Sequence, residues 1–321
     1  MRRLKVGQTA LRILVLMFLV VGLSLHAQQA PFDPGPTVNC NAPEGDLQKT
    51  IDNASAGSTI YVRGFCTRGP YFINKNLRLA PFDGNEPRGI SAVPGSNHVL
   101  HIRDASVEIN SLPFDAANAA HGIYVDHGSL RANSVEVANA SQGMGILLQG
   151  STLAAFDVTV RNSAQSGIHV GLTSTATINN SRLTNNDVGV FITEASSAIM
   201  GANVIETSRA VGVFVIAASS VFIVDTDMIN GNGVGLLVDR LSNASLFESR
   251  IEGNAGPGVY VSPWYSFLSL RTPVNTIQNN NPDVNCNDRA ILDLHAPQNS
   301  STKTSFIAAG CIVVNGPIFT P

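Results

Sequence analysis

A small group of side chains suited to acid–base chemistry and to sugar binding lies in the first half of the chain. His101 and Arg103 belong to the segment VLHIR, and Tyr124, Asp126 and His127 belong to YVDH, in which Tyr124 follows His101 by 23 residues. An imidazole and a carboxylate exchange protons, an arginine pairs with anions, and a tyrosine ring stacks on an apolar surface. These residue types together indicate a ligand-binding site or an acid–base centre.

Two further polar residues extend this candidate site. Gln149 follows Asp126 by 23 residues, and His169 lies further along the chain. The predicted ligand-binding residues are therefore His101, Arg103, Tyr124, Asp126, His127, Gln149 and His169, although each of them alone is more readily explained as a solvated surface group. The chain lacks the tight His or Cys spacing of a metal site, so no metal and no cofactor are predicted.

A short sequence repeat indicates which secondary-structure elements position these side chains. Seven segments share a glycine followed by an alternating apolar pattern, and their glycines are 22 or 23 residues apart. The glycines are Gly122, Gly145, Gly167, Gly189, Gly212, Gly235 and Gly258. This period indicates stacked repeats, because one repeat is too short to bury its own apolar side chains.

Alternation of apolar and polar residues within each period predicts β-strands. In the first repeat Ile123 and Val125 flank Tyr124, and two more short alternating stretches follow. Three strands per period without hairpin turns favour a parallel β-helix, in which each strand pairs with its equivalent in the next coil. The residues predicted to fill the bore are Ile123, Val125, Ile146, Leu148, Ile168, Val170, Val190, Ile192, Val213 and Val215.

The middle residue of each glycine segment is expected to point outward and to form a column along the helix. This outward column reads His101, Tyr124, Leu147, His169, Phe191, Phe214, Leu237 and Tyr260. Solvent-facing strand positions are normally polar, so an apolar column needs an explanation. Either the C-terminal tail or another chain packs over it, or its rings form a strip that stacks on sugars or docks a partner.

Four cysteines lie in two pairs at opposite ends of the repeat array. Between Cys66 and Cys286 lie nine to ten coils, roughly 45 Å at about 4.8 Å per coil. A disulfide requires Cα atoms within about 7 Å, so only Cys40–Cys66 and Cys286–Cys311 are geometrically feasible. Two disulfides predict an oxidising compartment.

The N-terminus has the features of a secretory signal peptide over residues 1–27. Four basic residues precede the apolar run ILVLMFLVVGLSL, which is shorter than the roughly 20 residues needed to span a bilayer. The predicted organisation is a signal peptide at 1–27, a linker at 28–37, the β-helix with an N-terminal capping helix at 38–285, and a C-terminal cap or tail at 286–321. A secreted protein, extracellular or periplasmic, without a membrane span after signal removal is expected.

Charge restricts the partners. The whole chain has a formal charge of −3, which becomes −7 once the four basic residues of the signal are removed. A moderately acidic surface argues against nucleic acid as a partner, and mildly against polyanions unless a cation bridges the charges. A monomer with a polysaccharide or cell-surface partner is expected.

The sequence resembles the right-handed parallel β-helix proteins of the pectin-lyase-like superfamily. The resemblance rests on the glycine segments followed by SLRANSVEVAN, TLAAFDVTVRN and ATINNSRLTNN, and on the entry segment GDLQKTIDNASAGSTIYVRGFC with FINKNLRLA. It covers roughly residues 38–285 and implies the fold. It does not imply one activity, because the superfamily includes lyases, hydrolases, esterases, epimerases and adhesins.

The catalytic patterns of that superfamily are mostly missing. AHGIYV at His121 is only faintly similar to a galacturonase Gly-His-Gly segment, and no in-register carboxylate pair supports glycoside hydrolysis. The first hypothesis is thus a non-catalytic surface or carbohydrate-interaction protein. The alternatives are a polysaccharide-active lyase or hydrolase, and a structural or adhesive protein that docks through the outward apolar strip.

Overall fold

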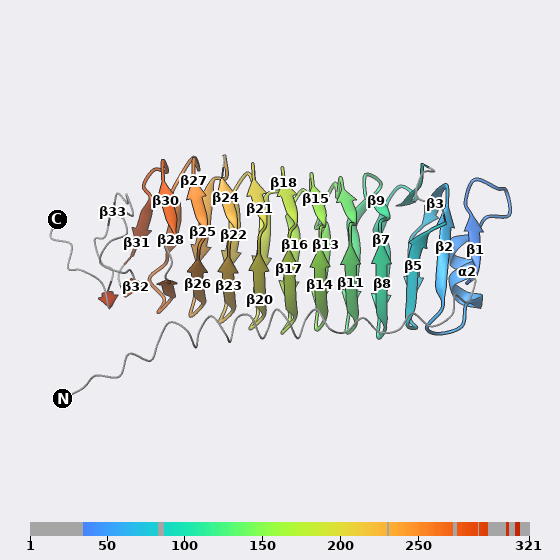
Figure 1. The fold of residues 1–321 in the computed structure, drawn as a ribbon, viewed down its shortest axis with the longest axis horizontal. Helices are drawn as coiled ribbons and strands as arrows, with labels where there is room; N and C mark the ends of the chain where they lie inside the picture. Colours follow the sequence, from blue (N-terminus) through green and yellow to red (C-terminus); the bar gives the residue numbers. More distant parts are fainter. Residues whose placement is uncertain are drawn as a thin grey trace, which may run out of the picture. The chain divides into compact units, whose positions relative to one another are not determined.

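Three parallel β-sheets wind around a single core. The computed structural model describes residues 35–82, 87–229, 231–271, 275–287, 289–294, 306–307 and 312–314. Within the unit Gly35–Pro321 these residues form an all-β solenoid of about 11 turns with one short helix (Figure 1). Each full turn contributes one strand to each sheet, so the prediction of three strands per period is confirmed.

Sheet C carries the predicted outward column. Its strands are β4 (Tyr71–Ile73), β7 (Ser96–Arg103), β10 (Ala119–Asp126), β13 (Ile146–Gln149), β16 (Ser166–Gly171), β19 (Val188–Ile192), β22 (Val211–Val215), β25 (Val234–Val238), β28 (Val259–Val261), β31 (Val284–Cys286) and β33 (Phe306–Ile307).

Sheet A follows sheet C along each coil and is the longest of the three. Its strands are β1 (Thr37–Asn39), β2 (Thr59–Arg63), β5 (Leu77–Pro81), β8 (Ser106–Asn110), β11 (Ser129–Asn133), β14 (Thr152–Phe156), β17 (Thr175–Asn179), β20 (Ser197–Gly201), β23 (Ser220–Val224), β26 (Asn243–Phe247), β29 (Phe267–Leu270), β32 (Ile291–Leu294) and β34 (Ile312–Val314).

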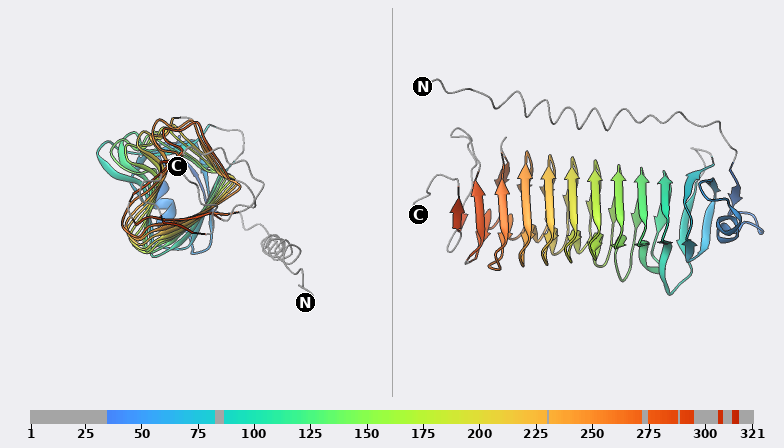
Figure 2. Two further views of the ribbon diagram at one scale, coloured as in Figure 1. Left: turned by 90° about the vertical axis from the view of Figure 1, so that its left-hand side faces the viewer. Right: turned by 90° about the horizontal axis from the view of Figure 1, so that it is seen from below.

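Sheet B closes each coil with short strands. These are β3 (Phe65–Gly69), β6 (Gly89–Ala92), β9 (Pro113–Asp115), β12 (Glu136–Ala138), β15 (Thr159–Arg161), β18 (Arg182–Thr184), β21 (Val204–Glu206), β24 (Asp227–Ile229), β27 (Arg250–Glu252) and β30 (Thr276–Gln278). In the end-on view of Figure 2 the successive coils lie over one another around a common bore.

The bore is filled as the alternation predicts. All ten residues expected to point inward, from Ile123 to Val215, are fully buried. Each pairs with its counterpart one coil later, for example Ile146 with Ile168 and Ile168 with Val190. The predicted register is therefore confirmed.

The repeated glycine has a steric cause. A side-chain Cβ on Gly145 would lie 2.7 Å from the carbonyl oxygen of Gly167, and one on Gly189 would lie 2.5 Å from that of Gly212. Both separations are shorter than real Cβ contacts, so any other residue would force the coils apart. The glycine column thus marks a place where neighbouring coils touch backbone to backbone.

Buried polar side chains close the turns between sheets. The Asn203 side chain accepts a hydrogen bond from the Ser181 amide (3.0 Å) and donates one to the Ile178 carbonyl (2.8 Å). Asn186 and Asn254 bridge coils in a similar way. Because a buried backbone group without a partner is costly, these asparagines compensate for turns that sheet pairing cannot satisfy.

Buried serines form a second ladder between coils. The hydroxyl of Ser174 accepts a hydrogen bond from the Ser151 amide, and that of Ser196 accepts one from the Ser174 amide, at 3.0 and 3.1 Å. Each serine thus supplies a partner for an amide in the coil before it. These ladders stabilise the stack only while all coils keep the same register, so they make register errors costly.

The N-terminal end contains the only helix among the described residues, α2 (Leu47–Asn53). Asp46 caps it by accepting a hydrogen bond from the Lys49 amide, and Leu47 and Ile51 pack into the solenoid core. The predicted Cys40–Cys66 disulfide joins this region, with a Cα–Cα distance of 4.9 Å. The predicted short N-terminal helix is thus present, while its capping role remains a prediction.

Several expectations concern residues outside the described part of the chain. The signal peptide at 1–27 lies there, as does Cys311, so the pairing Cys286–Cys311 stays a prediction. Sheets A and C continue past residue 285 through β32, β33 and β34. Among the described residues no helix is long and apolar enough to cross a membrane.

The register generates a first stability prediction. Replacing Ile168 with Asp places a carboxylate without a partner in the bore, so the free energy of unfolding should fall by about 4 kcal/mol or more. Thr177→Asp, on the exposed face of β17, is the matched control and should change it by about 0.5 kcal/mol or less. Denaturant unfolding of both variants tests this, and equal melting would contradict the inward orientation of Ile168.

A second prediction concerns the N-terminal disulfide. Replacing Cys40 and Cys66 together with Ser should cost about 3 kcal/mol, because the bridge closes a loop between residues 26 positions apart. Amide hydrogen exchange should increase around α2 and β2 and stay slow in β13 to β25, since solenoid repeats contact only their neighbours. Uniform loosening along the whole solenoid would contradict this local role.

Candidate functional site

The candidate residues lie on neighbouring strands near the start of sheet C. The pairing of β7 with β10 sets His101 beside Tyr124 and Arg103 beside Asp126. Their neighbours Ile102 and Val125 are buried in the bore, so strand alternation turns all four candidate side chains to the outer face. Residues that are one repeat apart in the sequence are therefore neighbours on two paired strands.

The whole outward column is in register as predicted. Each member from His101 to Tyr260 pairs with the next, and Phe72 on β4 precedes His101 while Asn285 on β31 follows Tyr260. Leu147 is buried, whereas Phe191, Phe214 and Leu237 are half-buried. The two interpretations of this apolar column, a covering tail or chain and a binding strip, both remain predictions.

Aromatic rings stack at the N-terminal end of this column. The His101 ring lies 4.5 Å from Tyr124 at an interplanar angle of 14° and 4.6 Å from Phe72, centroid to centroid. The His98 ring lies 4.9 Å from His101 and 5.4 Å from Phe72. We call Phe72, His98, His101 and Tyr124 the ring cluster.

The imidazoles of the ring cluster are short of hydrogen-bond partners. Among the described residues, Nε2 of His98 and both nitrogens of His101 are buried without a partner. Burial lowers the pKa of His98 to about 4, with the nearby His101 and His121 adding to the effect. Burial also lowers the pKa of His101, against the opposing influence of Asp126. Both imidazoles are thus neutral at pH 7, and each ring can donate one hydrogen bond and accept another.

Asp126 is the centre of the polar part of the site. One of its oxygens lies 2.6 Å from Nδ1 of His127, and the other lies 3.5 Å from Nε of Arg103. His127 reaches back to Asp126 because it occupies a turn with φ of 51°. Nε2 of His101 is 4.0 Å from Asp126, beyond hydrogen-bond distance.

A second carboxylate, which was not among the predicted site residues, also lies beside Arg103. Asp104, in the turn after β7, has an oxygen 3.7 Å from Nε of Arg103, so Arg103 contacts both Asp104 and Asp126. The pairing was missed because Asp104 belongs to a turn and not to the strand register. The guanidinium thus sits between two carboxylates, with its side chain 61% exposed.

Gln149 joins the site through Tyr124, whereas His169 does not. The Tyr124 hydroxyl donates a hydrogen bond to Oε1 of Gln149 on the next coil. His169 is separated from Tyr124 by Leu147 in the column and packs edge-on against Phe191 at 4.9 Å. The structure therefore brings together six of the seven predicted residues and sets His169 apart.

Sequence reasoning missed His98 and Phe72 as neighbours of the site and did not select His121. His98 pairs with His121 one coil later, just as His101 pairs with Tyr124, so the repeat contained this signal. Nδ1 of His121 accepts a hydrogen bond from the Met144 amide (3.1 Å). Phe72 and His101 are separated by more than one regular repeat, and this irregular spacing hid their pairing.

Within the described part of the chain, no three His, Cys, Asp or Glu side chains are grouped closely enough to hold a metal ion. Asp126 is already paired with His127 and Arg103. The expectation that no metal or cofactor binds remains a prediction from the sequence.

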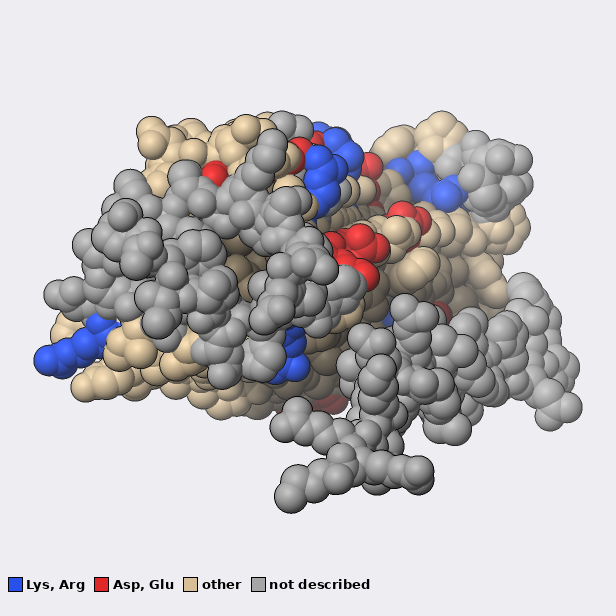
Figure 3. Space-filling model, turned by 60° about the vertical axis from the view of Figure 1, so that its left-hand side comes forward, with Lys and Arg blue, Asp and Glu red and all other residues tan. Residues whose placement is uncertain are grey.

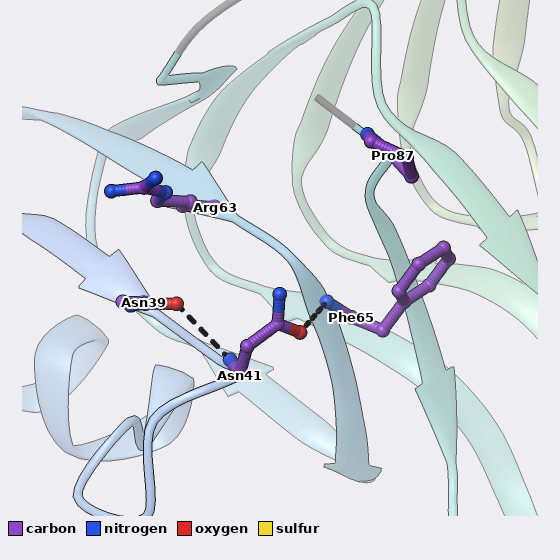
Figure 4. A pocket seen from close by; sticks show the side chains of 5 residues that line it. All are labelled: Asn39, Asn41, Arg63, Phe65 and Pro87. Atoms are coloured by element: carbon purple, nitrogen blue, oxygen red, sulfur yellow. Dashed lines mark hydrogen bonds between the residues drawn. The ribbon is translucent and has the colours of Figure 1, made fainter.

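A cavity near the N-terminal coils is a weaker candidate. It has a volume of about 490 Å³ and is lined by Asn39, Asn41, Arg63, Phe65 and Pro87 (Figure 4). The Asn41 side chain accepts a hydrogen bond from the Phe65 amide (3.1 Å), and the Asn41 amide donates to the Asn39 side chain (3.2 Å). These amide side chains therefore hold the local loop together.

Several charged residues elsewhere are paired with opposite charges. Acidic and basic side chains lie near one another on the face shown in Figure 3. Ion pairs join sheet B residues Arg161 to Glu136, Arg182 to Glu206 and Arg250 to Glu252. Such exposed pairs contribute little stability and produce no strong field of one sign.

The buried imidazoles predict acid sensitivity. Because the folded state holds the pKa of His98 near 4 instead of its ordinary 6.5, the unfolded state binds more protons between these values. Stability should therefore fall as pH decreases from 6.5 toward 4. Melting curves across this range should show a smaller decline for His98→Gln than for the parent, with His127→Gln as the exposed-histidine control. An unchanged slope in His98→Gln would contradict the burial of this imidazole.

Comparison with known proteins agrees with the architecture. No curated protein matches the sequence. Among solved structures, the Azotobacter vinelandii mannuronan C-5 epimerase AlgE6 A-module is similar, with 21% identity and a TM-score of 0.62 over 77% of this chain and 74% of that chain. The AlgE4 A-module from the same organism has 13% identity and a TM-score of 0.58 over 84% and 94% of the two chains. The enzymatically active domain of bacteriophage CBA120 tailspike protein 2 has 12% identity and a TM-score of 0.51 over 87% and 46%.

These identities establish the fold alone, whereas the sequence itself matches a family. The model of the right-handed β-helix region matches residues 144–306, about half of the chain. The resemblance inferred from the repeat is thereby confirmed. The chain belongs to the right-handed β-helix family.

Proposed function

We propose that this protein binds a polysaccharide chain on the outer face of sheet C, over β7, β10 and β13. The observation that carries the proposal is the ring cluster with its buried imidazole nitrogens that lack partners. Polar atoms of this kind normally find a partner, and a sugar presents hydroxyls that both donate and accept. Movement of the rings on binding would give the nitrogens these partners.

The polar half of the site complements such a ligand. Asp126 offers acceptor oxygens for sugar hydroxyls, and the exposed Arg103 offers donors for a hydroxyl or a carboxylate. Gln149 accepts a hydrogen bond from the Tyr124 hydroxyl and thereby holds the tyrosine ring in place. An apolar ring bordered by a few placed polar groups is the usual composition of a small-molecule site.

The similar folds support a carbohydrate ligand. Two of them are mannuronan C-5 epimerase modules, so a solenoid of this kind can carry a polysaccharide site. Their likeness to this chain is confined to the fold, and the choice of ligand here rests on the ring cluster and Asp126. The net charge still favours a neutral or weakly acidic chain over a dense polyanion.

A catalytic role on the same polysaccharide is the second candidate. Neutral imidazoles beside Tyr124 and Arg103 provide a base, an acid and a cation within one patch, as a lyase or an epimerase requires. Asp104 and Asp126 on either side of Arg103 also keep hydrolysis among the candidate reactions. Chain shortening, unsaturated ends or altered stereochemistry after incubation with a polysaccharide panel would favour catalysis over binding.

Secretion completes the proposal. The Cys40–Cys66 disulfide is stable in an oxidising compartment and agrees with the signal-like N-terminus. Export places the outer face of sheet C in contact with extracellular or periplasmic polysaccharides.

Tyr124 and Asp126 provide the test of binding. Against a panel of neutral and acidic polysaccharides, Tyr124→Ala should weaken binding of the best ligand by about 1 kcal/mol or more, and Asp126→Ala should also weaken it by removing an acceptor. Phe214→Ala, four coils away in the same column, is the matched control for a short oligosaccharide. Titration calorimetry, with melting curves to verify folding, measures these effects.

The opposite pattern would redirect the assignment. Loss of binding in Phe214→Ala with a neutral Tyr124→Ala would contradict the proposed site and favour docking of a partner on the apolar strip. Failure of the parent to bind any polysaccharide of the panel would contradict the proposal as a whole.

A further inference from the structure

A second aromatic patch lies toward the other end of sheet C and is strongly exposed. Trp264 and Tyr265 follow β28 in the turn toward sheet A, and their side chains are 64% and 61% exposed. Leu241, in the equivalent turn one coil earlier, is 60% exposed. The two turns are joined by a hydrogen bond of 2.8 Å from the Leu241 amide to the Trp264 carbonyl. Large apolar side chains rarely gather on a monomer surface without a partner.

Polar residues beside this patch repeat the composition of the first site. Asp239, in the turn after β25, accepts a hydrogen bond from the Ser262 hydroxyl, and one of its oxygens lies 3.7 Å from Nε of Arg240. The Tyr260 hydroxyl accepts a hydrogen bond from the Asn287 amide group. Toward both ends of sheet C, a tyrosine is therefore hydrogen-bonded to a side-chain amide, and a carboxylate lies beside an arginine in the same or the neighbouring coil.

We propose that Trp264 and Tyr265, with Tyr260, Asp239 and Arg240, form a distal subsite for the polysaccharide chain that binds at Tyr124. This inference rests on the proposed function and specifies the ligand further, as a chain long enough to reach both ends of sheet C. Continuity supports it, because Tyr260 belongs to the same outward column as Tyr124.

The separation of the two subsites sets the ligand length. Tyr260 lies six coils after Tyr124, which corresponds to roughly 29 Å at about 4.8 Å per coil. The half-buried Phe191, Phe214 and Leu237 lie between them and offer few polar groups. A long chain that engages both ends gains from the high effective concentration of its second segment, whereas a short one occupies a single subsite.

The chain offers a built-in probe, because Trp264 is its only tryptophan. Mannuronan and a neutral glucan are each separated into a fraction shorter and a fraction longer than the roughly 29 Å span, at about 4.8 Å per coil. When the long fraction of the binding polysaccharide is added to saturation, the emission of Trp264 should shift to shorter wavelength, and Trp264 should be protected from quenching by acrylamide. The parent should also bind the long fraction about tenfold or more tightly than the short one.

Variants identify which residues cause the length dependence. Trp264→Ala should remove the tenfold advantage of the long fraction and leave the short-fraction affinity at Tyr124 unchanged. Phe222→Ala, an exposed apolar residue on the outer face of sheet A, is the matched control and should retain the parent behaviour. Because Trp264 is exposed, its removal should leave the melting temperature unchanged, and this is verified for each variant.

The outcomes separate this inference from the proposed function. The distal subsite is wrong and the proposed function stands if three results occur together. Tyr124→Ala weakens binding, the emission of Trp264 in the parent does not change when the ligand binds, and Trp264→Ala binds the long fraction as tightly as the parent does. If neither polysaccharide binds the parent, both are wrong for these ligands, and the exposed patch belongs to a different partner such as a protein.

Discussion

Close backbone contact between coils is the constraint on which the rest of this structure depends. Along sheet C, each repeated glycine lies so near the next coil's carbonyl that a Cβ would stand 2.5 to 2.8 Å from it, from Gly122 on β10 to Gly235 on β25. A single larger residue there would separate two coils and break the hydrogen bonds of the three sheets at that level. The nearly constant repeat length therefore follows from the need to bring a glycine back to the same place in every turn.

The proposed binding site lies where the outward column of sheet C departs from its apolar pattern. Outward positions in the middle of sheet C hold half-buried Phe and Leu side chains, whereas the first coils substitute His, Tyr and Asp. Burying neutral imidazoles without hydrogen-bond partners costs stability, and most of the imidazole nitrogens in this state lie beside Tyr124 and Asp126. Concentration of such costs at one place is characteristic of binding and catalytic sites.

Much of this protein was determined by the sequence itself. In a parallel, in-register solenoid a sequence difference of one repeat equals one step between coils, so His101 and Tyr124, or Phe191 and Phe214, could be placed side by side without coordinates. The inward residues and the pairings of His101 with Tyr124 and of Asp126 with Gln149 followed from the same rule. The Cys40–Cys66 pair followed from the distance between the two ends of the array.

Only the tertiary structure decided the contacts that the one-repeat strand register does not specify. Phe72 entered the ring cluster across an irregular spacing, and Asp104 and His127 approached Arg103 and Asp126 from turns whose conformation no period specifies. The exposure of Trp264 likewise depends on the conformation of the turn after β28. Strand register converts sequence distance into spatial distance, whereas turn geometry and ring orientation depend on packing between residues that the repeat does not relate.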